Sequence, residues 1–169
     1  MIEFRSAIVP ELAQLKTFLF EHGSNPWNHL PYEGVDKEFQ LVANGAATAL
    51  MAFENQTLVG FVIFCHPQAF PHAYLEYTHT QPAIFISEAV VHRDYAGRGI
   101  GHRLLARIID QAADFGASML VIDRHDENAA SAGMMRKAGF IVLKTFVDLE
   151  RRHYGNHKTA VLVLQLTVT

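Results

Sequence analysis

The sequence is poor in cysteine, in apolar runs and in clustered charge, and each shortage excludes a class of protein. Cys65 is the only cysteine, so an intrachain disulfide cannot form and a reducing compartment is expected. The residues from Met1 to Arg5 carry charges where a signal peptide needs an apolar segment. No apolar run approaches the ~18 residues that span a bilayer. We therefore expect a cytoplasmic protein without a membrane segment.

Basic residues are too scattered for a protein that binds along nucleic acid. The formal net charge is -3, and no basic block matches a phosphate backbone. The chain is 50% hydrophobic and 18% charged, which is typical of a protein with a buried core and not of a disordered chain. Its 169 residues fit one domain, covering residues 1–169.

Apolar periodicity and turn residues predict about seven strands and four helices. The expected strands span residues 2–8, 46–53, 58–65, 83–92, 119–122, 140–147 and 159–168, and the expected helices span residues 10–21, 35–42, 99–115 and 128–137. Residues 22–34 and 66–82 are expected to be loops. This order predicts an α/β domain on one mixed sheet, with a parallel part around the long third helix.

Three alternating glycines, Gly97, Gly99 and Gly101, follow an apolar strand and lead directly into an amphipathic helix. Glycine has no Cβ, so a phosphate can approach the backbone closely. The helix start also offers unpaired N–H groups and the positive end of the helix dipole. The pattern indicates a pyrophosphate site, with an ordinary glycine-rich turn as the alternative. It is not the dinucleotide fingerprint, because His102 stands at the third glycine, and no Walker lysine follows.

The glycine loop resembles the acyl-CoA-binding motif of the GNAT superfamily of N-acetyltransferases. That motif has Arg or Gln, two variable residues, Gly, one variable residue, and Gly or Ala; here Ala96 takes the first position. The resemblance implies that backbone amides of the loop hold the pyrophosphate of acetyl-CoA. The loop residues that it assigns to this cofactor are Ala96, Gly97, Arg98, Gly99, Ile100, Gly101 and His102.

A second motif of the same family compares with residues 128–140. The positions that match at the family's spacing are Asn128, Ser131, Lys137, Gly139 and Phe140. By resemblance Asn128 contacts the pantetheine arm, and a helix N-cap is the alternative role. The family's usual general acid is a tyrosine, and Met135 replaces it here. Methionine donates no proton, so Tyr95, Tyr154, His125 or water are the candidate donors.

Glu88 is the candidate general base. Strand alternation places it on the face of Ile84, Ile86 and Val90. A carboxylate on an apolar face is costly unless it is paired or functional, and desolvation raises its pKa toward neutrality. A structural glutamate paired with a cation is the alternative. In many GNAT enzymes a glutamate on this strand takes the amine proton, which favours the base role.

The same resemblance assigns a role to the backbone that follows Glu88. The backbone of Ala89, Val90 and Val91 would pair with the pantetheine arm like an added strand. One amide there would polarise the thioester carbonyl, as an oxyanion hole does.

Two aromatic residues in loop 22–34, Trp27 and Tyr32, are candidate substrate contacts. An aromatic cluster can stack over a cationic amine, and the alternative for Trp27 is a core position. The histidines show no recognised metal-ligand spacing, so we expect no metal.

These features predict an N-acetyltransferase that moves an acetyl group from acetyl-CoA directly to a primary amine of a small molecule, in a ternary complex. A protein N-terminus or lysine is the alternative acceptor. A catalytically silent acyl-CoA-binding sensor is the alternative of another class, and Met135 favours it. A homodimer is a further expectation, because many relatives pair through their last strands.

Overall fold

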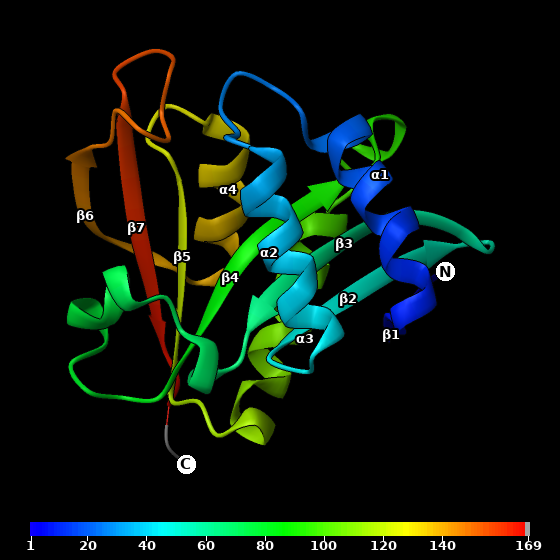
Figure 1. The fold of residues 1–169 in the computed structure, drawn as a ribbon, viewed down its shortest axis with the longest axis horizontal. Coiled ribbons are helices and arrows are strands. Elements are labelled where there is room, and N and C mark those ends of the chain that lie inside the picture. Colours follow the sequence, from blue (N-terminus) through cyan, green and yellow to red (C-terminus); the bar gives the residue numbers. More distant parts are fainter. Residues whose placement is uncertain (168–169) are drawn as a thin grey trace.

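The computed structural model describes residues 1–167 of the chain, which contain one seven-stranded sheet (Figure 1). Its strands are β1 (Ile2–Ser6), β2 (Ala47–Glu54), β3 (Thr57–Cys65), β4 (Ala83–Val91), β5 (Met119–His125), β6 (Ile141–Val147) and β7 (Lys158–Gln165). They lie side by side in the order β1-β2-β3-β4-β5-β7-β6. Only β4 and β5 are parallel, and the other neighbours are antiparallel. The predicted mixed sheet is confirmed.

The α-helices within residues 1–167 are α1 (Leu12–Gly23), α2 (Tyr32–Ala43), α3 (Ile100–Gln111) and α4 (Ala129–Ala138), and they cover both faces of the sheet (Figure 1). Leu19 of α1 and Phe39 of α2 pack in one core, whereas Leu104 of α3 and Met135 of α4 pack in another. α3 crosses over between the parallel strands, so the predicted α/β fold with seven strands and four helices is confirmed. In this part of the chain, every helix is too short or too polar to cross a membrane.

Some element boundaries differ from the sequence prediction. α2 begins at Tyr32, because Pro31 takes an extended backbone conformation (φ -68, ψ 136) directly before the first turn. The predicted loop 66–82 contains two short 3-10 helices, Pro67–Ala69 and His72–Thr78. The last strand ends at Gln165, and its predicted end at residue 168 lies outside the described residues.

A β-bulge in β4 decides which face Glu88 occupies. Glu88 and Ile86 pair with consecutive residues of β3, so Ser87 is an extra residue in β4. Side chains beyond Ser87 therefore change face: Val90 packs in the core under α1 and α2, whereas Ile84 and Ile86 pack in the core under α3. The prediction that Glu88 shares the face of Ile84 and Ile86 is wrong, because strict alternation ignores this bulge.

β4 and β5 separate beyond the bulge. Their pairing covers only Ala83–Ile86 and Met119–Ile122, although β4 continues to Val91 and β5 to His125. From residue 87 onward, the edge of β4 that faces β5 has no strand partner within residues 1–167. The splayed ends leave backbone groups available to a bound molecule.

β6 is the outer strand on one side of the sheet. It exposes the apolar side chains of Ile141, Val142 and Val147. Exposed strand edges favour pairing with a second chain. The homodimer stays a prediction.

Candidate active site

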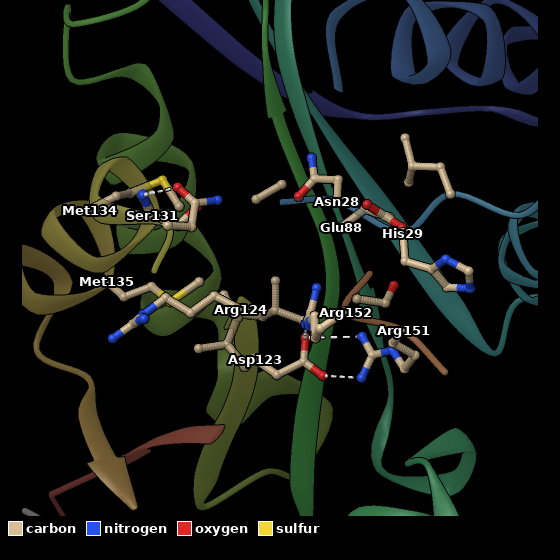
Figure 2. Close-up of a pocket in the computed structure, with 16 residues that line it drawn as sticks. Asn28, His29, Glu88, Asp123, Arg124, Ser131, Met134, Met135, Arg151 and Arg152 are labelled. Atoms are coloured by element: carbon tan, nitrogen blue, oxygen red, sulfur yellow. Dashed lines mark hydrogen bonds and ion pairs between the residues drawn. The ribbon is translucent and has the colours of Figure 1, made fainter. Parts of the chain in front are cut away.

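A small cavity of about 70 Å³ lies where β4 and β5 separate. The residues labelled in Figure 2 line it: Glu88 on β4, Asp123 and Arg124 on β5, Ser131, Met134 and Met135 on α4, Asn28 and His29 before α2, and Arg151 and Arg152 after β6. We call it the strand-gap cavity. It brings together segments that are far apart in the sequence.

The glycine loop lies at the N-terminus of α3. Gly97 (φ 81) and Gly99 (φ 76) are in the left-handed region, and a Cβ at either position would meet nothing within 4 Å. Arg103 N–H donates to the Gly99 carbonyl at 3.0 Å, so the N–H groups of the turn before Arg103 point out of the helix end. Open space above free amides is what an anion requires.

Gly101 has a different role from the other two glycines. A Cβ at this position would collide with Met134 Sδ. Gly101 therefore allows α3 to pack closely against α4, and this contact holds the glycine loop beside the strand-gap cavity.

Most side chains of the glycine loop are engaged elsewhere or are apolar, so they offer little to a bound anion. Arg98 forms an ion pair with Glu54 at 3.4 Å and lies over the Tyr95 ring at 4.7 Å. Ile100 is buried in the core, so only its backbone faces the loop. His102 Nδ1 is buried and has no hydrogen-bond partner among the described residues. Ala96 is exposed.

The predicted pantetheine-binding residues lie along the free edge of β4. Ala89 lines the strand-gap cavity, whereas the Val90 side chain is buried in the core under α1 and α2. Val91 packs against the core under α3. The valines can therefore reach a ligand only through their backbone. Asn128 lines the cavity and also caps α4, because its Oδ1 accepts from Ser131 N–H at 3.2 Å.

Glu88 contacts a second carboxyl group, that of Glu38 on α2. The two carboxyl groups lie close enough to shift each other's pKa, which favours a proton on one of them. Burial, followed by the Glu38 charge, raises the Glu88 pKa well above its usual range. Burial likewise raises the Glu38 pKa to about 7. Glu38 Oε2 is buried without a hydrogen-bond partner among residues 1–167. Because the Glu38 pKa is about 7, the pair can hold and release one proton near neutral pH.

Asp123 anchors two arginines beside this carboxyl pair. Its Oδ2 accepts from Arg151 Nη1 at 2.8 Å and from the Tyr74 hydroxyl at 2.7 Å, and its Oδ1 lies 3.5 Å from Arg152 Nη2. Although burial opposes it, the Arg151 charge lowers the Asp123 pKa. Arg152 also donates to the Trp27 carbonyl at 3.1 Å. This network ties the loop before α2 to the end of β5.

A larger cavity of about 640 Å³ lies on the other side of the carboxyl pair. Glu38, Asp123 and Arg151 line it together with the 3-10 helix 72–78 and β6. We call it the aromatic cavity, because Tyr74, Tyr77, Phe85 and Phe146 are among its lining residues. Asp123 and Arg151 line both cavities.

The structure does not bring the three candidate proton donors, Tyr95, Tyr154 and His125, into either cavity. His125 accepts from Glu127 N–H at its Nδ1 (3.0 Å) and bonds the Tyr154 carbonyl through its Nε2 (2.7 Å), so both ring nitrogens are engaged. The Tyr154 side chain is exposed, and Tyr95 packs against His92. Met135 does line the strand-gap cavity, at the position where the family motif has tyrosine.

Arg124 is the cation on the α4 side of the strand-gap cavity. Its Nη1 donates to the carbonyls of His125 (3.2 Å) and Asp126 (2.6 Å). Its Nε is buried with no partner among the described residues, and burial lowers its pKa. The backbone bonds thus hold a positive charge near Met135 (Figure 2).

The two predicted substrate residues are placed differently. Trp27 packs against His125, with ring centroids 4.7 Å apart, and its neighbours Asn28 and His29 line the strand-gap cavity. The Tyr32 side chain is 78% exposed and packs on Phe20, so the structure does not bring it to either cavity. Within residues 1–167, no group of three or more His, Cys, Asp or Glu side chains could hold a metal ion.

Sequence reasoning missed several residues of the site. Glu38 appears as an ordinary polar position between the buried Val35 and Phe39, and no local signal distinguishes it. A local signal did exist for Asp123 and Arg124. They follow the apolar run 119–122 directly, and functional sites are commonly built where parallel strands end.

The sequence profile of the acetyltransferase (GNAT) family matches residues 11–140. The solved structure of yncA from Salmonella typhimurium with its cofactor acetyl-CoA superposes with a TM-score of 0.74 at 22% identity, covering 100% of this chain and 96% of that one. An acetyltransferase of Bacillus subtilis in complex with CoA gives a TM-score of 0.68 at 19% identity and covers 98% of each chain. At these identities the structures show a shared fold.

Two curated relatives match about half of the chain. The L-amino acid N-acyltransferase MnaT of Escherichia coli is 32% identical over 94 residues, which cover 55% of this chain and 49% of that protein. The L-methionine sulfoximine/L-methionine sulfone acetyltransferase of Salmonella typhimurium is 29% identical over 93 residues, covering 55% of this chain and 50% of that protein. The match thus spans about half the length of these two relatives.

Proposed function

Because the chain belongs to the acetyltransferase (GNAT) family, we propose that it transfers an acetyl group from acetyl-CoA to the primary amine of a small molecule. The observation that carries this proposal is the Glu88–Glu38 pair, which lies between the strand-gap cavity and the aromatic cavity. A thioester in the first cavity and an amine in the second would meet at a group that can take a proton. Transfer is then direct, within a ternary complex.

The chain has groups that fit acetyl-CoA at each expected position. Free amides at the start of α3 and the open space over Gly97 and Gly99 suit the pyrophosphate. The unpaired edge of β4 around Ala89 suits the amide-bearing pantetheine arm. Acetyl-CoA supplies the acyl group as a thioester when bound. These fits support acetyl-CoA as the donor.

The carboxyl pair acts as general base in this proposal. As the amine nitrogen bonds to the acyl carbon, it loses a proton, which Glu88 accepts directly or through water while the proton that Glu88 already holds passes to ionised Glu38. Glu38 shares the proton, and its own pKa is raised to about 7, close to neutral pH. A base with a pKa near the working pH is most effective.

Arg124 supports the departure of the thiolate. When the carbon–sulfur bond breaks, negative charge develops on sulfur, and a fixed cation stabilises it. Arg124 is held by backbone carbonyls on the α4 side of the cavity, where Met135 stands. The charge is stabilised by this guanidinium, and solvent supplies the proton that a tyrosine would otherwise give.

The activities of two relatives support a small-molecule acceptor. MnaT is an L-amino acid N-acyltransferase, and the Salmonella typhimurium enzyme acetylates L-methionine sulfoximine and L-methionine sulfone. A silent acyl-CoA-binding sensor is the second candidate, because Met135 removes the tyrosine of the family motif. A transferase releases CoA when an amine is present, whereas a sensor binds acetyl-CoA without releasing it.

The test is thiol release from acetyl-CoA across a panel of amines, comparing wild type with Glu88→Gln. We expect amine-dependent release that the variant lowers by at least a hundredfold, within the 10²–10⁴-fold range for a general base. Acetyl-CoA binding, followed by calorimetry, should change little. Glu33→Gln is the matched control, because Glu33 lies on the exposed start of α2. Binding without release for any amine would favour the sensor, and full activity in Glu88→Gln would reject the base.

A further inference from the structure

The aromatic cavity and the strand-gap cavity both extend to the carboxyl pair of Glu38 and Glu88. Glu38 lines the aromatic cavity and contacts Glu88, which lines the strand-gap cavity. Asp123 and Arg151 line both. A molecule in the aromatic cavity can therefore place one nitrogen at the carboxyl pair while its body remains among the aromatic rings.

The cations of this cavity offer little to an acceptor that carries a carboxylate. Arg151 already bonds Asp123 at 2.8 and 3.4 Å and the Tyr74 hydroxyl at 3.1 Å. Asp148 lies 3.8 Å from the same guanidinium. A substrate carboxylate at Arg151 would have to displace these partners.

The remaining charges of the lining are mostly negative. Lys144 is its other cation, and its ammonium lies over the Tyr77 ring at 5.9 Å on an exposed part of β6. Glu38, Glu76 and Asp148 are acidic residues of the same lining. A cation entering the cavity is attracted, and an anion is repelled.

The rest of the lining is apolar and aromatic. Tyr74 lies between Tyr77 and Phe85, with ring centroids 5.7 and 5.5 Å apart. Phe146 extends this surface from β6. Aromatic faces bind both apolar groups and ammonium cations.

We propose that the aromatic cavity is the acceptor site and that it selects amines with an aromatic or other apolar body and no carboxylate. This inference rests on the proposed transferase function. The ammonium group is attracted by the acidic lining, and the body packs on the aromatic rings. α-Amino acids are disfavoured, because Arg151 is engaged and the acidic lining repels a carboxylate.

The experiment compares matched pairs that differ only in the carboxylate: phenethylamine with phenylalanine, and tryptamine with tryptophan. Thiol release from acetyl-CoA gives kcat/KM for each, and calorimetry in the presence of CoA gives their binding. We expect the amine of each pair to be preferred at least tenfold in both measurements. Equal or better use of the amino acids overturns the inference and leaves the transferase function standing. Amines that bind selectively but are not acetylated support the site and reject the transferase function. Failure of all four compounds in both measurements overturns the inference as well.

A charge reversal at the rim tests the electrostatic part. Glu76 is exposed on the 3-10 helix 72–78, so Glu76→Lys should fold normally. We expect this variant to lower kcat/KM for phenethylamine at least fivefold and to raise it for phenylalanine. Glu33→Lys makes the same change in net charge away from both cavities and should alter neither value. Parallel shifts for amine and amino acid in Glu76→Lys would contradict the proposed selectivity.

Discussion

Replacing Glu38 with glutamine should change how the free energy of unfolding depends on pH. Burial raises the Glu38 pKa in the native protein from its ordinary 4.5 to about 7. A carboxyl group whose pKa is raised on folding contributes full stability below its unfolded pKa. That stability is lost as the pH rises through the folded pKa. The loss should therefore occur between about pH 4.5 and 7.

The magnitude follows from the size of the rise. From 4.5 to about 7 is a difference of about 2.5, which corresponds to about 3 kcal/mol at about 1.4 kcal/mol per pKa unit. The glutamine of the Glu38→Gln variant keeps the side-chain shape, cannot ionise, and can donate its amide N–H to Glu88. Part of this difference is already present at pH 5, so the stability of this variant relative to wild type should increase by about 2–3 kcal/mol between pH 5 and pH 8. Domains have ~5–15 kcal/mol of total stability, so the effect is measurable.

Urea unfolding followed by far-UV circular dichroism at pH 5, 6, 7 and 8 measures this difference. Glu33→Gln is the control on the same helix, because the Glu33 side chain is 88% exposed, and its difference from wild type should not vary with pH. A pH-independent difference for Glu38→Gln would show that Glu38 ionises normally. A difference that grows toward acid would reverse the sign and refute the buried carboxyl pair.

Three further substitutions test other parts of the site. Gly99→Ala should raise the KM for acetyl-CoA about tenfold, because a Cβ would fill the open space over the glycine loop and a φ of 76 disfavours alanine. Gly45→Ala is the control, with a φ of 83 and equally open space. It should lose similar stability in thermal unfolding and leave the KM for acetyl-CoA unchanged. Asp123→Asn should cost about 3–5 kcal/mol in urea unfolding, because the buried guanidinium of Arg152 is left beside a neutral partner. A loss below about 1 kcal/mol would mean that the network relaxes. Arg124→Gln should lower kcat ten- to hundredfold with little change in acetyl-CoA binding, and unchanged kcat in a steady-state assay would exclude Arg124 from thiolate stabilisation.

The fold and the backbone geometry of the glycine loop could be predicted because their signals are local. The buried face of α3, including Leu104 and Ile108, follows from residues spaced one helical turn apart. The glycine loop needs only a strand end, left-handed positions such as Gly97 and Gly99, and a helix start, all within one short stretch. Neighbours in sequence are then neighbours in space.

The position of Glu88 and its partner were decided by tertiary structure. The sequence identified Glu88 as a candidate base but grouped it with Ile84 and Ile86, which lie on the opposite face, because the bulge at Ser87 depends on how β4 pairs with β3. Glu38 could not be predicted, since its contact with Glu88 depends on how α2 packs across the sheet. A single sequence records periodicity along the chain, whereas a shared proton requires two groups that folding brings together from distant positions.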